Sequence, residues 1–125
     1  MVDHEKNKSQ SEILVKQIEE FVTYLGVEKN YAQNTIESYE RDLLKFLSFL
    51  INRNIADWLE IESDTVNLFV MGLRHSEMSG KSIRRFLSSI RGFFNFLINN
   101  GVMDKNPALS IQTPKIDRVL PKTID

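Results

Sequence analysis

The apolar residues of this chain recur at three- and four-residue spacing, and no segment alternates apolar and polar positions as a half-buried strand does. The only prolines, Pro107, Pro114 and Pro121, lie near the C-terminal end. Because proline breaks the interior of a helix, the long proline-free stretch before them favours helix throughout. The pattern therefore predicts an all-α fold.

The apolar spacing predicts four helices, over residues 11–27, 31–51, 63–78 and 79–99. The start of the second helix stays open, because Asn30 with Gln33 and Asn34 with Glu37 both fit a capping box. The fourth helix is expected to stop at the Asn-Asn-Gly run over residues 99–101, since glycine commonly follows the end of a helix.

The chain is expected to divide into a flexible N-terminus, a helical domain and a linker, over residues 1–10, 11–104 and 105–125. Three X-Pro steps seven residues apart, interleaved with Lys115, Arg118 and Lys122, predict that the linker is an extended basic connector. The chain reaches Asp125 without a recognisable ending, so we expect it to be part of a longer protein.

The composition narrows the classes of site that the chain can carry. There is no cysteine, which excludes disulfides and thiolate zinc sites. His4 and His75 are far apart in sequence, so neither a metal site nor a cofactor is predicted. No apolar run approaches the roughly 20 residues of a membrane-spanning helix, and no secretory signal opens the chain. These features suit a cytoplasmic protein.

The net charge of −1 hides a strong segregation of charge along the chain. Residues 1–78 hold 8 basic and 14 acidic side chains, a net charge of −6, whereas residues 79–125 hold 8 basic and 3 acidic ones, a net charge of +5. No acidic residue occurs between Met78 and Met103. An anion-binding face is therefore expected in the fourth helix.

One side of the fourth helix combines cations with small polar residues: Lys81, Ser82, Arg84, Arg85, Ser88, Ser89, Arg91, Gly92 and Asn95. Such a face can enter the major groove of DNA, where Arg and Lys reach phosphates and guanine edges. The alternative is the solvated side of an ordinary amphipathic helix. The absence of balancing acidic residues favours the DNA-binding interpretation.

The second helix offers a weaker companion face, with Asn34, Thr35, Ser38, Arg41 and Lys45 on its polar side. Its acidic residues Glu37 and Asp42 would oppose DNA unless they are turned away. They could instead form ion pairs within the helix, Asp42 with Lys45 or Glu37 with Arg41, which is the alternative to a binding role.

Two motifs and a linker resemble the N-terminal SAM-like domain of phage-integrase-type tyrosine recombinases. Residues 34–43 match its N-T-x-x-x-Y-x-x-D-L signature, and residues 81–94 look like its fourth helix, with an L-S-x-[IVL]-R core. Asn106-Pro107-Ala108 and the later proline steps are similar to the linker of Xer recombinases, nearer to the XerC branch than to XerD. The family often has a serine or similar small cap where Ala32 stands, so the start of the second helix departs from the pattern.

The resemblance implies a four-helix SAM-like bundle that forms half of a C-shaped clamp on a double-stranded recombination site, with partner protomers in a tetramer. By position it assigns DNA contact to Asn34, Thr35, Ser38, Arg41, Lys81, Ser82, Arg84, Arg85 and Ser88. Lys115, Arg118 and Lys122 would follow the DNA backbone along the linker. Tyr39 is interpreted as a core residue with its hydroxyl near the surface, and Trp58 as packing.

The catalytic residues of that family are missing from this chain. It has no H-x-x-R motif, and its tyrosines, Tyr24, Tyr31 and Tyr39, all lie in the first helical half of the chain. The expected role is therefore DNA binding within a longer recombinase that forms a phosphotyrosyl intermediate. That recombinase is expected to serve chromosome dimer resolution, with mobile-element integration left open by the sequence. The alternatives are a helical protein-interaction module and a helix-turn-helix regulator; an independent enzyme is the least favoured.

Overall fold

The structure, a computed structural model, describes residues 2–112, with side chains from Ser11 onward. Its elements are four α-helices and one short 3-10 helix: α1 (Val2–Val27), α2 (Gln33–Asn52), η1 (Trp58–Glu60), α3 (Ser63–His75) and α4 (Gly80–Asn99). No strand occurs in the described part of the chain. The expectation of an all-α fold built from four packed helices is confirmed.

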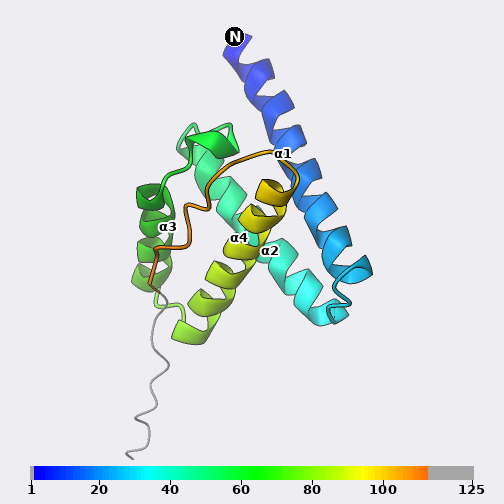
Figure 1. The fold of residues 1–125 in the computed structure, drawn as a ribbon. Helices are drawn as coiled ribbons and strands as arrows, with labels where there is room; N and C mark the ends of the chain where they lie inside the picture. The colour runs from blue at the N-terminus through cyan, green and yellow to red at the C-terminus, as the bar shows by residue number, and fades with distance from the viewer. Residues whose placement is uncertain (1, 113–125) are drawn as a thin grey trace, which may run out of the picture.

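Helices α2 and α4 cross at the centre of the molecule, with α1 on one flank and α3 on the other (Figure 1). Both central helices begin at the same end, the lower one in Figure 1, and diverge towards it. Their crossing encloses an aromatic core in which Phe21, Phe46, Phe93 and Phe94 are fully buried. This arrangement leaves the starts of α2 and α4 at the same end of the fold, on either side of the crossing.

Trp58, in η1, closes the opposite side of this core. It is 2 % exposed and meets Phe93 edge-on, with ring centroids 4.9 Å apart. Its indole N–H donates to the side-chain oxygen of Gln17, so the polar atom of a buried indole is satisfied. The interpretation of Trp58 as a packing residue is confirmed.

The first helix begins at Val2, nine residues before its predicted start. Residues 2–10 contain neither proline nor glycine, so nothing in their sequence ends the helix. They are helical in the structure, where a flexible terminus was expected. The division of the chain at residues 10 and 104 stays a prediction.

Helix α2 begins after Ala32, which makes no side-chain cap, so neither of the two capping boxes left open by the sequence forms. Asn30 instead adopts a left-handed conformation, with φ of 56°, in the turn that leaves α1. Asparagine tolerates this region better than most residues do. Helix α3 also ends early, at His75, because Glu77 turns left-handed with φ of 63°.

Residues 102–112, which we call the strap, run back over α4 towards α3 (Figure 1). Met103, Ala108 and Ile111 are buried, and the hydroxyl of Ser110 lies 3.2 Å from that of Ser63 in α3. The part of the expected connector that the structure describes, residues 105–112, therefore packs against the helices. The sequence pattern missed this packing because the apolar anchors are only three and five residues apart and show no helical period.

Candidate nucleic-acid interface

The first two turns of α4 present free cations. The hydroxyl of Ser79 accepts a hydrogen bond from the backbone N–H of Ser82 at 3.1 Å and so caps the helix. Lys81 and Arg84 are exposed and form no hydrogen bond or ion pair with another described residue. Ser88 is exposed one turn further along. These three residues, all predicted to contact DNA, are thus open to solvent.

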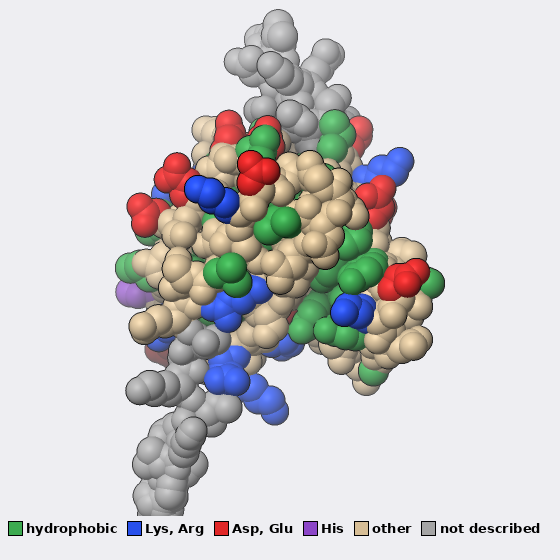
Figure 2. All heavy atoms as spheres, in the orientation of Figure 1, with side chains coloured by type: hydrophobic (Ala, Val, Ile, Leu, Met, Phe, Trp, Pro, Cys, Tyr) green, Lys and Arg blue, Asp and Glu red, His purple; other side chains and the backbone are tan. Residues whose placement is uncertain are grey.

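The charge of the surface is uneven. Figure 2 shows Lys and Arg side chains gathered around the beginning of α4, whereas Asp and Glu side chains lie mainly in the upper half of that face and at its edge. Neither α2 nor α4 has an acidic residue in its first turn. Because acidic residues usually offset the positive end of the helix dipole, both helix starts remain favourable places for an anion.

The polar stripe of α2 reaches the same end of the molecule. Asn34, Arg41 and Lys45 are exposed, and Ser38 is half-buried, with its hydroxyl 3.4 Å from a guanidinium nitrogen of Arg41. Thr35, which was also predicted to contact DNA, is half-buried. The structure thus brings the predicted residues of α2 and the first half of α4 to one end of the fold.

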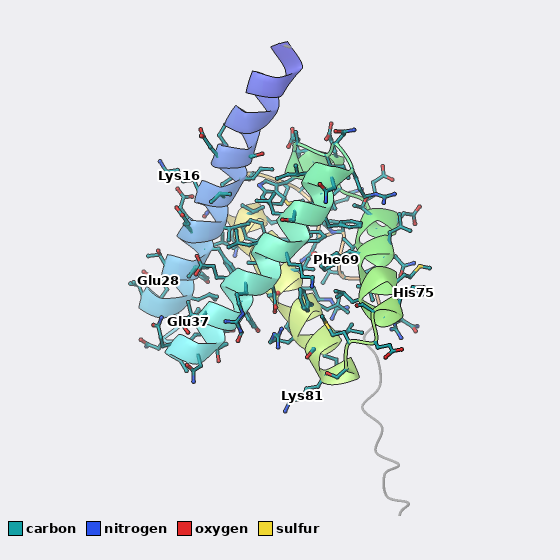
Figure 3. All side chains as sticks on the ribbon, turned by 180° about the vertical axis from the view of Figure 1, so that it is seen from behind. Lys16, Glu28, Glu37, Phe69, His75 and Lys81 are labelled. Carbon is teal, nitrogen blue, oxygen red and sulfur yellow. The ribbon has the colours of Figure 1, made fainter. Side chains whose placement is uncertain are left out.

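Glu37 lies at this end too, as Figure 3 shows, where Lys81 marks the start of α4 and Lys16 the far part of α1. Its carboxylate accepts a hydrogen bond from the side-chain amide of Gln33 at 3.2 Å. It remains exposed, so it is a negative charge beside the candidate interface.

Asp42 and Arg85 join the two crossing helices. The guanidinium donates from Nε to Oδ2 and from Nη2 to Oδ1, each at 2.8 Å, and Asp42 is only 2 % exposed. The hydrogen bond with Asp42 is the main cause that raises the pKa of Arg85 above its ordinary value. Neither ion pair left open within α2 occurs among the described residues.

Sequence reasoning missed the Asp42–Arg85 pair because its members are 43 positions apart. The available signal was the position of Asp42 at the margin of the apolar side of α2, where an acidic residue needs a cationic partner. The pair removes the repulsion that Asp42 would exert on DNA, and it gives Arg85 a structural partner.

Tyr39 and Ser88 form a second polar link between α2 and α4. Burial, and then the neighbouring Tyr31 and Asp42, raise the pKa of the half-buried Tyr39, while a hydrogen bond with Ser88 and the charge of Arg85 lower it by less. The rings of Tyr31 and Tyr39 meet edge-on at 6.0 Å. The sequence predicted a core position for Tyr39 with its hydroxyl near the surface; in the structure the residue is half-buried and packs against the core.

The second half of α4 uses its polar side for packing. Arg91 donates from Nε to the carbonyl oxygen of Ala108 at 2.9 Å and from Nη2 to that of Ile111. The side-chain amide of Asn106 donates to the Arg91 carbonyl at 3.1 Å and to the side-chain oxygen of Asn95 at 2.9 Å. Arg91, predicted to meet DNA, is therefore engaged with the strap.

Ser89 also departs from the expected polar face. It is fully buried, and its hydroxyl donates to the Phe86 carbonyl at 2.8 Å. Of the predicted linker cations, Lys115, Arg118 and Lys122 lie outside the described residues.

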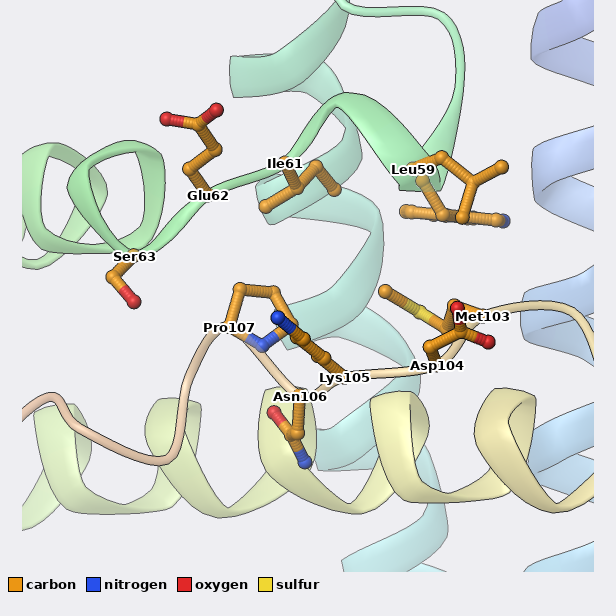
Figure 4. Close-up of a pocket in the computed structure, with 10 residues that line it drawn as sticks. Leu59, Ile61, Glu62, Ser63, Met103, Asp104, Lys105, Asn106 and Pro107 are labelled. Atoms are coloured by element: carbon orange, nitrogen blue, oxygen red, sulfur yellow. The ribbon is translucent and has the colours of Figure 1, made fainter.

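Two hollows that border η1, the strap and the helices have different linings. One, about 360 Å³, lies between η1 and the strap, lined by Ile61, Met103 and Pro107 among others; Figure 4 shows the Asn106 side chain directed away from it, towards α4. None of the predicted DNA-contact residues lines it. The other, about 330 Å³, lies between α1, α2 and α4, and Ser88 is part of its wall.

The described residues show neither a metal centre nor a membrane span. No cluster of three or more His, Cys, Asp and Glu side chains suited to a metal ion occurs among them. None of their helices combines the length and apolar character that a membrane crossing requires.

The fold and the site define a class of protein: a helical domain with a basic end where two of its helices begin. Residues 18–101 match the family described as phage integrase, N-terminal SAM-like domain. The chain belongs to this family.

The chain is similar to tyrosine recombinases of the Xer type. It is 34 % identical over 109 residues to tyrosine recombinase XerC of Herpetosiphon aurantiacus, covering 87 % of this chain and 36 % of the relative. It is 35 % identical over 109 residues to tyrosine recombinase XerD of Listeria monocytogenes, covering 86 % and 37 %. The two branches match about equally, so identity does not favour XerC. The chain spans about a third of the length of these relatives. No solved structure matches it significantly.

Proposed function

We propose that this chain binds double-stranded DNA through the end of the molecule where α2 and α4 begin. One observation carries the proposal: two helix starts without an acidic residue in the first turn lie at the same end of the molecule, on either side of the crossing, with the free cations Lys81 and Arg84 and the exposed Arg41 near them. Basic side chains and helix N-termini both favour phosphate. Membership of the phage-integrase SAM-like family supports the same conclusion.

In this arrangement the helix starts point at the major groove, which is wide enough to admit a helix. Lys81 and Arg84 neutralise phosphates, because their flexible cationic side chains are unpaired. Asn34, Ser38 and Ser88 supply short polar groups that reach a base edge or a phosphate without filling the groove. Lys115, Arg118 and Lys122 continue the contact to the DNA backbone.

The function proposed for the parent protein is site-specific recombination. The relatives are tyrosine recombinases more than twice as long as this chain, which leaves room for a catalytic part outside the matched region. The domain would clamp a recombination half-site, position that catalytic part and take its place beside partner protomers. The role that we expect for the parent protein, from the Xer-like motifs of the sequence, is chromosome dimer resolution in the cytoplasm.

The test is binding of the 125-residue chain to a labelled duplex that carries a Xer-type core half-site, followed by fluorescence anisotropy between about 50 and 200 mM salt. Affinity should fall with salt, with a log–log slope of about −0.9 for each phosphate neutralised. The double variant Lys81→Ala, Arg84→Ala should lower the steepness of that slope by about 2.

The matched control is Lys16→Ala, Lys105→Ala, which removes the same charge from exposed positions outside the interface. It should leave the slope almost unchanged. The absence of any DNA binding by the chain at low salt would refute the proposal. Equal weakening by the two double variants would place the contact somewhere other than the start of α4.

A further inference from the structure

The guanidinium of Arg85 is fixed along one edge only. Its Nε and Nη2 atoms donate to the two carboxylate oxygens of Asp42, each at 2.8 Å, and its Cζ atom lies 5.5 Å from the centre of the Phe86 ring. Asp42 is 2 % exposed, whereas the Arg85 side chain is 39 % exposed. A buried anion on α2 therefore holds a cation that still reaches solvent from α4.

The other edge of the same group is free. A guanidinium carries five N–H donors, and the bonds to Asp42 use two of them. Three remain, two on Nη1 and one on Nη2, and no other described residue accepts from them. They lie side by side at the end of the group, where they match two acceptors such as O6 and N7 of guanine or two phosphate oxygens.

We propose that Asp42 is a positioning residue, which orients Arg85 so that this free edge contacts DNA. The inference rests on the proposed function and deepens it. A side chain already held in one orientation loses less conformational freedom on binding than a free arginine does. Because the two residues come from different helices, the direction of the contact also depends on the crossing of α2 and α4.

A purely structural ion pair predicts a different effect on DNA affinity. Asp42→Asn removes a negative charge close to the interface, so general electrostatics predicts tighter binding of the duplex. If Asp42 positions Arg85, the same change should weaken DNA binding about 10-fold, because one bidentate contact between Arg85 and DNA is lost or weakened. The two roles thus predict opposite signs.

The experiment compares the wild-type chain, Asp42→Asn and Arg85→Lys for affinity and for the sequences that each enriches from a randomised duplex pool. Arg85→Lys keeps the charge but cannot make the bidentate bond and present a second edge. Thermal unfolding followed by circular dichroism sets a temperature at which each variant is fully folded. The interface variant Lys81→Ala, Arg84→Ala reports general DNA binding.

Weaker binding by both single variants with loss of a preferred guanine would support contact with a base edge. Weaker binding without a change in preference would support contact with a phosphate. Unchanged or tighter binding by folded Asp42→Asn, with the same preference, would overturn the positioning role while the proposed function stands. A wild-type chain that binds no duplex would refute the proposed function, and the inference with it.

Discussion

The two halves of α4 share a sequence pattern but differ in what their polar residues do. In residues 80–88, Lys81 and Arg84 point to solvent without a partner. In residues 89–99, Arg91 and Asn95 hydrogen-bond to the strap, and Gly92 lies against Phe21 of α1. The polar side of the first half keeps two cations without a partner among the described residues, beside the Asp42–Arg85 pair, whereas the polar side of the second half is hydrogen-bonded to the strap.

A basic helix face is therefore available to a ligand only where no other segment of the chain hydrogen-bonds to its cations. Arg91 satisfies two strap carbonyls, whereas no described residue approaches Arg84 closely enough to bond. The two arginines, seven residues apart, point in nearly the same direction around the helix. Matched substitutions in the two halves of α4 should therefore have different effects.

The largest difference is expected between Arg91→Ala and Arg84→Ala. Removing Arg91 leaves the carbonyls of Ala108 and Ile111 without their cationic donor, at a cost of about 2–3 kcal/mol in the free energy of unfolding. The melting temperature should fall on the order of 10 °C. Arg84→Ala should change stability by less than about 0.5 kcal/mol. Equal melting temperatures by circular dichroism would contradict the division of α4.

A smaller loss, about 1–2 kcal/mol, is expected for Asn106→Ala. The Asn106 side chain bonds Arg91 and Asn95 in α4 and accepts from the Ala108 N–H at 3.0 Å, so its removal loosens the strap. The control is Asn67→Ala, since Asn67 is exposed and makes only a weak 3.8 Å contact with the Met71 sulfur. Urea unfolding measures the free energy of unfolding of both variants. An equal loss of stability in Asn67→Ala would contradict a specific role of Asn106 in holding the strap.

Glycine substitutions test how closely the second half of α4 meets α1. A Cβ at Gly72 of α3 would meet nothing within 4 Å, so Gly72→Ala should stabilise the fold by about 0.5–1 kcal/mol through helix propensity. At Gly92 the new atom would lie 3.4 Å from the buried Phe21 ring, and part of that gain should be lost. A larger gain in stability for Gly92→Ala than for Gly72→Ala, in the same unfolding assay, would show that α1 and α4 are not closely packed at Gly92.

The smallest effect is expected at the boundary between the halves, where Tyr39 of α2 meets Ser88. Burial raises the Tyr39 pKa in the folded chain above its ordinary value of 10.0. The unfolded state therefore releases this proton at a lower pH, and the stability from neutral Tyr39 declines as the pH rises from about 10 through the folded pKa. Tyr39→Phe should flatten the alkaline fall of the unfolding free energy; an unchanged fall would exclude Tyr39 as its source.

Much of the fold could be predicted from local pattern. The apolar spacing gave the number and approximate positions of the four helices, and the Asn-Asn-Gly run gave the end of α4, where Gly101 has φ of 78°. Residue type also predicted the buried role of Trp58. These features depend on neighbours within a few positions, which the sequence contains directly.

The candidate site could be predicted only in part. The charge segregation and the motifs indicated α4 and α2, and the structure brings their starts to one end. The sequence could not show that Arg85 pairs with Asp42, or that Arg91 holds the strap, because each partner is remote along the chain. Helical angles describe one helix at a time and say nothing of the segment that packs against it.

The sequence by itself therefore determined the helices, their apolar faces and the family to which the chain belongs, because each of these is written in local spacing and motif. Only the tertiary structure decided which cations remain free. A guanidinium binds whichever oxygens lie within reach, and the crossing of α2 and α4 and the return of the strap determine which oxygens those are.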